Sequence, residues 1–75
     1  MNKTYDLYFA AFLTSSGMAL SKAVREGKRV AFVFDDVSAE EWEESKTAYF
    51  NGDAAVKALA YGFAIRSLKS LVHVT

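Results

Sequence analysis

The segment 18-MALSKAVREGKRVAFVF-34 decides the fold, because its pattern is that of two strands joined by a glycine turn. Apolar residues stand at even spacing on both sides of the turn: Met18, Leu20 and Val24 before it, and Val30, Phe32 and Phe34 after it. This alternation places them on one face of a strand, and Gly27 supplies the positive φ of a tight turn. An isolated hairpin is unstable in water, so helices must cover its apolar face.

The stretch before the hairpin predicts a helix from Tyr5 through Ser15. Thr4 or Asp6 can cap its start, and Gly17 stands where a left-handed residue ends a helix. A strand is the alternative, because the apolar residues of this short run also alternate. The Ala10–Ala11 pair and the glycine stop favour the helix, which is apolar on almost every side and therefore mostly buried.

Ser38 predicts the start of a second helix. Its hydroxyl can cap the N–H of Glu41, and Val37 and Trp42 hold the positions of a hydrophobic staple. The aromatic residues expected to point inward are Trp42, Tyr49 and Phe50. Asn51-Gly52 ends this helix.

Asp53 is the expected cap of a third helix that runs toward Val72. Two apolar stripes follow at helical spacing: Val56, Leu59, Ala60 and Phe63, and then Tyr61, Ile65, Leu68 and Val72. Two stripes form a wider apolar arc than one contact needs, so we expect part of this helix to form a subunit interface. The second stripe, Tyr61, Ile65, Leu68 and Val72, is the candidate surface for a homodimer. The fold class is α+β, a single small domain over 1–75 in the order helix, β-hairpin, helix, helix.

Composition limits the chemistry that the chain can perform. The chain has 75 residues, 52% of them hydrophobic, a formal net charge of zero, no cysteine and a single histidine. Disulfides, thiolate metal sites and sites with two imidazoles are therefore excluded, and no cofactor is expected. The first apolar run, Leu7 to Leu13, is too short to span a bilayer, so we expect a cytoplasmic protein without a membrane segment.

Two charged clusters are candidates for binding. The basic residues are Lys22, Arg25, Lys28 and Arg29 on the hairpin, with Arg66 and Lys69 on the third helix, and they suit nucleic-acid phosphates. The acidic cluster within 35–44 consists of the candidates Asp35, Asp36, Glu40, Glu41 and Glu44, which suit a divalent cation or could mimic nucleic acid. Solvation of the hairpin and compensation of a helix dipole explain the two clusters without a ligand.

Nucleophilic catalysis has no candidate group in the sequence. His73 stands two residues from the end, with no serine or carboxylate at catalytic spacing, and the serines are explained by helix ends. We therefore expect a protein that is not an enzyme.

Several segments together resemble a known family. They are 5-YDLYFAAFL-13, Gly17, 27-GKRVAFVFD-35 and 49-YFNG-52, and the likeness covers nearly the whole chain. The family is one of short, uncharacterised bacterial and phage-associated proteins grouped as a domain of unknown function. The resemblance implies a compact α+β domain of phage or mobile-element background, and it implies no catalytic residue, cofactor or partner.

Surplus apolar surface is the only positive indication of function. Aromatic residues make up 15% of the chain, and they dominate the energetics of interfaces as well as of cores. The sequence therefore predicts a small non-catalytic interaction module that self-associates and binds a protein partner. The alternative is an accessory protein that binds nucleic acid through the basic hairpin.

Overall fold

A three-stranded antiparallel sheet and three helices make up the part of the chain that the structure, a computed structural model, describes: residues 2–52 and 55–75. The elements are β1 (Lys3–Thr4), α1 (Leu7–Ser15), β2 (Lys22–Glu26), β3 (Arg29–Val33), α2 (Ala39–Phe50) and α3 (Ala58–Val74). The α+β class and the order of helix, hairpin and two helices are confirmed. The short strand β1 was not predicted.

The hairpin of β2 and β3 forms around Gly27, whose φ is 65°. Among the described residues only glycines have a positive φ, so Lys28, the second residue of the turn, has a negative φ. A positive φ at the first turn residue alone is the pattern of a type II′ turn. The prediction that the first strand begins at Met18 is wrong. Met18 N–H donates to Leu13 O at 3.1 Å and closes the C-terminus of α1, where Gly17 has a φ of 98°.

The segment Leu7–Ser15 is a helix rather than a strand, and its N-cap is Asp6 rather than Thr4. Its carboxylate accepts from Tyr8 N–H at 2.9 Å and Phe9 N–H at 3.2 Å. The helix therefore begins at Leu7, two residues later than predicted, and Thr4 instead belongs to β1. Lys3 and Thr4 pair with Val33 and Phe32 of β3, and a strand of two residues is too short to show a periodic pattern.

The predicted start of α2 is confirmed. Glu41 N–H donates to Ser38 Oγ at 3.1 Å, and both staple residues, Val37 and Trp42, are buried. The Glu41 carboxylate accepts from the Ser38 hydroxyl rather than from its backbone N–H. Asn51 caps the C-terminus of this helix.

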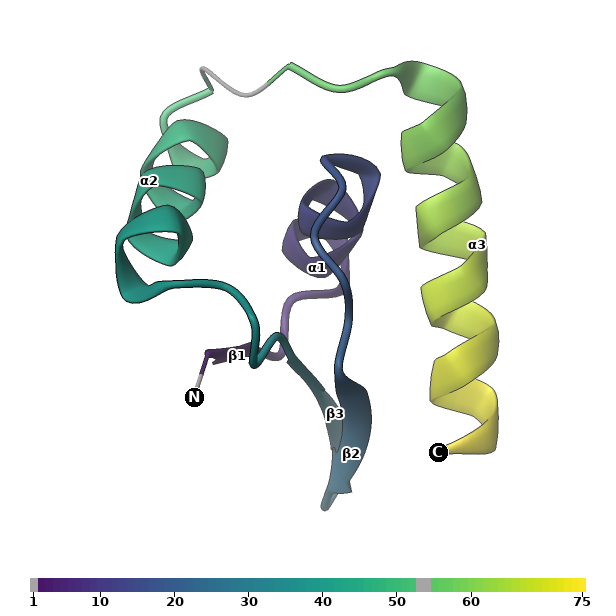
Figure 1. Cartoon of the computed structure of the whole chain (residues 1–75). Helices are drawn as coiled ribbons and strands as arrows, with labels where there is room; N and C mark the ends of the chain where they lie inside the picture. Colours follow the sequence, from purple (N-terminus) through teal and green to yellow (C-terminus); the bar gives the residue numbers. More distant parts are fainter. Residues whose placement is uncertain (1, 53–54) are drawn as a thin grey trace.

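The predicted start of α3 is wrong. Asp53 lies outside the described residues, and the described residues 55–57 are not helical; α3 begins at Ala58, after Lys57. Lys57, the N-cap, has extended backbone dihedrals of φ −74° and ψ 121°, so the helix begins after it. Figure 1 shows α1 between α2 and α3.

The core forms around α1, which is why that helix is apolar on almost every side. Its central residues Phe9, Ala10, Ala11, Phe12 and Leu13 are all buried. The sheet contributes Val30 and Phe32, Phe34 follows β3 directly, α2 contributes Trp42, and α3 contributes Leu68. Since helices α2 and α3 pack on α1 rather than on each other, each keeps a face toward solvent (Figure 1).

Candidate functional site

The stripe of α3 predicted to hold a second subunit packs on the protein's own core. Leu68 is only 4% exposed, and Tyr61, Ile65 and Val72 are half-buried against the same cluster. The hydroxyl of Tyr61 also donates to Tyr8 O of α1, at 3.3 Å. Because α3 lies along α1, this stripe is the one covered within the monomer. The expectation that Tyr61, Ile65, Leu68 and Val72 form a free apolar face is therefore corrected.

The first stripe of α3 is the exposed one. Leu59 is 72% exposed and Phe63, one turn later, is 56% exposed, while Val56 just before the helix is also exposed. The guanidinium carbon of Arg66 lies 4.8 Å from the centre of the Phe63 ring. These side chains form an apolar ridge with a cation at its side, which we call the Leu59–Phe63 ridge.

A shallow groove of about 430 Å³ runs beside this ridge, between the end of α1 and α3. It is lined by Thr14, Ser15, Ala60, Phe63, Ala64, Ser67 and Leu68. The hydroxyls of Thr14 and Ser15 donate to carbonyls of α1, Ala11 O at 3.1 Å and Phe12 O at 2.8 Å. Since these donors are already used and Ala60 and Ala64 are small, the groove suits an apolar contact at short range.

Aromatic rings cluster around Phe9 on the other side of α1. Its ring centre lies 5.4 Å from that of Trp42, 5.3 Å from Tyr49 and 5.7 Å from Phe50. Burial, followed by the neighbouring Tyr61 side chain, raises the pKa of Tyr49 to about 12. Phe50 is exposed at the rim of this cluster, where the sequence predicted an inward position.

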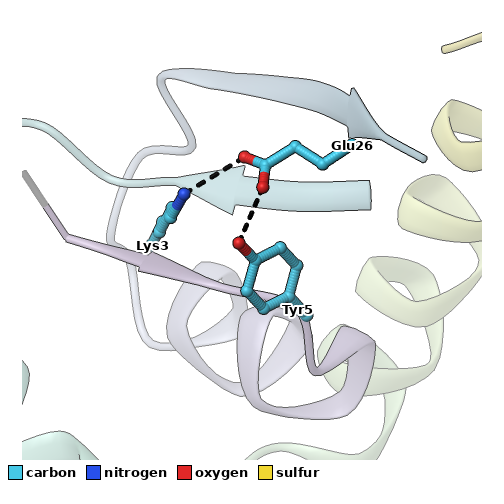
Figure 2. A network of polar contacts seen from close by, with 3 residues as sticks. All are labelled: Lys3, Tyr5 and Glu26. Atoms are coloured by element: carbon cyan, nitrogen blue, oxygen red, sulfur yellow. Dashed lines mark hydrogen bonds and ion pairs between the residues drawn. The ribbon is translucent and has the colours of Figure 1, made fainter. Parts of the chain in front are cut away.

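The outer face of the sheet, which is the face away from the helices, carries a polar network (Figure 2). Glu26 of β2 accepts from Tyr5 Oη at 2.7 Å and from Lys3 Nζ at 3.1 Å, so two side chains from the N-terminal segment cross over β3. The Arg29 guanidinium carbon lies 3.6 Å from the centre of the Tyr5 ring. The Tyr5 hydroxyl and then Lys3 hold the pKa of Glu26 below its usual range.

This network explains why β3 is buried on both faces. Ala31 and Val33 point to the outer face, away from the helices, yet they are 0% and 2% exposed. Tyr5 and Lys3 reach across them to Glu26. Sequence reasoning missed this network because Lys3 and Tyr5 stand 23 and 21 residues from Glu26.

The six candidate nucleic-acid residues are distributed over different faces. Strand alternation puts Lys22 on the outer face and Arg25 on the inner face, where its Nη2 donates to Val72 O of α3 at 3.0 Å. Arg29 stacks on Tyr5, and Lys28 is in the turn. On α3, Arg66 lies over Phe63, and Lys69 is exposed. The fold therefore does not bring the hairpin cations to one face.

The acidic residues of 35–44 are exposed at the start of α2. Among the residues that the structure describes, no group of three or more acidic, histidine or cysteine side chains is arranged to hold a metal ion. His73 lies exposed in the last turn of α3, where a cation interacts favourably with the helix dipole.

No family model, curated protein or solved structure matches the chain. The resemblance to a phage-associated family therefore stays a prediction. Within the described residues, every helix is too short or too polar to cross a membrane.

Proposed function

We propose that the protein is a small non-catalytic interaction module that binds a protein partner through the solvent face of α3. The observation that carries the proposal is the Leu59–Phe63 ridge, where two large apolar side chains one helical turn apart are more than half exposed. Burying such side chains in a partner stabilises a complex by roughly 25 cal/mol per Å² of apolar area. The absence of cysteine and the single histidine favour a binding role over catalysis.

The groove beside the ridge defines the kind of partner segment that fits. It is open to solvent, and small side chains at Ala60, Ala64 and Ser67 let another backbone come close. An amphipathic helix that lays its apolar face into a groove is a recurrent mode of recognition. Arg66 beside Phe63 provides a cation for an acidic residue at the edge of such a helix.

A photo-crosslinking amino acid placed at Phe63 tests this proposal in the native host. We expect a discrete adduct from this position and none from Ser70, an exposed position on the same helix. Adding Leu59→Asp should abolish the adduct, whereas Lys69→Asp should leave it unchanged. Equal adducts from Phe63 and Ser70, or an adduct insensitive to Leu59→Asp, contradict the proposal.

Nucleic-acid binding is the competing function, and its salt dependence distinguishes it. Phosphate binding weakens linearly with the logarithm of salt concentration, whereas apolar association changes little. If the protein bound nucleic acid through the hairpin, its affinity for DNA or RNA would depend on salt and would be lost when Arg25, Lys28 and Arg29 are replaced together. We expect neither result. A titration with such a slope would favour the nucleic-acid function.

A further inference from the structure

The open edge of the sheet is a second contact surface, separate from α3. Within residues 2–52 and 55–75 the strand order is β1-β3-β2, so among these residues β2 has one bonded neighbour and one free edge. All five residues of β2 are at least partly exposed, and Figure 1 shows β2 in front of β3 with no other strand beside it. An edge of this kind exposes unpaired N–H and C=O groups that can pair with another strand. The opposite edge, β1, is only two residues long.

The hairpin register identifies which backbone groups face the open edge. Glu26 and Arg29 flank the two-residue turn and form its hydrogen-bonded closing pair. Bonded pairs alternate with non-bonded pairs along an antiparallel ladder, so Val24 bonds toward β3. The backbone groups of Ala23 and Arg25 therefore point away from β3. Among the described residues, no other hydrogen bond reaches these groups.

The sequence of β2, 22-KAVRE-26, is complementary to itself when it runs antiparallel. With Val24 on a two-fold axis, Lys22 of one copy stands opposite Glu26 of the other, and Val24 stands opposite Val24. These side chains share the outer face, where opposite charges and β-branched pairs across strands are favourable. Val24 is 37% exposed in the monomer, so an apolar side chain stands at the centre of this pairing.

The charge pattern and the backbone directions select the same register. Placing Lys22 opposite Glu26 places Ala23 opposite Arg25, and these are the two residues with outward backbone groups. We therefore propose that β2 pairs antiparallel with β2 of a second copy, about a two-fold axis at Val24, to form a continuous six-stranded sheet.

The side chains around this edge are compatible with pairing. Glu26 accepts one hydrogen bond at each carboxylate oxygen, from Tyr5 and from Lys3, and each oxygen has a further lone pair for Lys22 of the second copy. The Arg25 side chain is held at Val72 O on the inner face, where the C-terminal end of α3 stabilises its charge. Neither side chain needs to leave its monomer contact.

This proposal is independent of the Leu59–Phe63 ridge, because that ridge lies on α3 and remains free for a different partner. The edge of β2, rather than the stripe Tyr61, Ile65, Leu68 and Val72 that α1 covers, is then the surface through which two copies meet. Dimers of this kind are closed by their symmetry, since the same patch serves both copies.

A single cysteine at Val24 gives the sharpest test, because the chain has no cysteine of its own. Residues on the axis of a non-hydrogen-bonded pair have Cα atoms about 4.5 Å apart, which suits a disulfide. Under mild oxidation we expect Val24→Cys to convert mostly into a reducible dimer and Lys28→Cys, exposed in the turn of the same hairpin, to remain mostly monomeric. Equal cross-linking of the two variants overturns the proposal.

Sedimentation without oxidant provides the second arm. The unmodified chain should be dimeric at concentrations on the order of tens of micromolar. Lys22→Glu puts like charges opposite each other and should shift it toward monomer, whereas Lys28→Glu, with the same charge change, should not. Ala23→Pro removes an outward N–H and should also give monomer, with the fold checked by Trp42 fluorescence. The proposal is overturned if the unmodified chain is monomeric, or if Lys22→Glu and Lys28→Glu change the dimer equally. In the cross-linking experiment, adding Phe63→Asp should leave the Val24→Cys dimer intact.

Discussion

The hydroxyl of Tyr5 donates to Oε1 of Glu26 at 2.7 Å, joining residues 21 positions apart in the chain. This bond links the segment after β1 to β2 across the central strand. With the Lys3–Glu26 ion pair, it attaches a strand of only two residues to the rest of the sheet. These side chains thereby cover part of the outer face of the sheet.

Tyr5→Phe removes this hydrogen bond while keeping the ring under Arg29. This hydrogen bond stabilises only the folded state, so we expect the free energy of unfolding to fall. Urea titration followed by Trp42 fluorescence measures the loss. Tyr8→Phe, another tyrosine substitution on the surface, is the control and should cost less; equal losses would contradict a role for the Tyr5–Glu26 bond.

Glu26 should make stability depend on acid pH. Its pKa is lowered from the usual 4.5, first by the Tyr5 hydroxyl and then by Lys3, so the folded state favours the charged form. The stabilisation is fully present above the unfolded pKa and is lost as pH falls through the lower folded pKa. Glu26→Gln should flatten the decline in melting temperature below about pH 4.5. A decline identical to that of the unmodified protein would show that Glu26 does not contribute to it.

Tyr49 should make stability depend on alkaline pH. Burial and then Tyr61 raise its pKa to about 12, so the folded state favours the neutral phenol. An unfolded tyrosine loses its proton near pH 10, so the stability is present below that pH and falls as pH rises toward 12. Tyr49→Phe should reduce this fall, measured by thermal unfolding between these pH values. If stability falls equally with rising pH in both proteins, the ionisation of Tyr49 does not cause the fall.

Phe9 should be among the most sensitive core positions. It is buried and contacts the rings of Trp42, Tyr49 and Phe50. Phe9→Ala leaves a cavity that costs about 3–5 kcal/mol, a large fraction of the stability of a small domain. Far-UV circular dichroism and urea unfolding should show a largely unfolded or strongly destabilised chain. Phe50→Ala, at the exposed rim of the same cluster, should cost far less.

The two stripes of α3 should respond differently to charge. Leu68→Asp buries a carboxylate in the core and should unfold the domain or lower its stability by several kcal/mol. Phe63→Asp places the same group in solvent, so its melting temperature should stay close to that of the unmodified protein. Thermal unfolding of the two variants decides the matter; similar losses would contradict the observed orientation of α3.

Local chemistry was sufficient to predict part of this structure. The Gly27 turn, the Ser38 cap and the helical pattern of α1 each depend on residues a few positions apart, so their signals are contained in short windows. The order of elements and the α+β class follow from these local signals.

The sequence by itself thus determined the type and order of the main elements, because helix caps and turns form among neighbouring residues. Only the tertiary structure decided which stripe of α3 meets α1, since two stripes of similar hydrophobicity fit the helical period equally well. It also decided the position of β1, the start of α3 at Ala58, and the free edge of β2. These features depend on contacts between distant residues, and they leave the free edge and the exposed ridge, which are the two surfaces that we propose for binding.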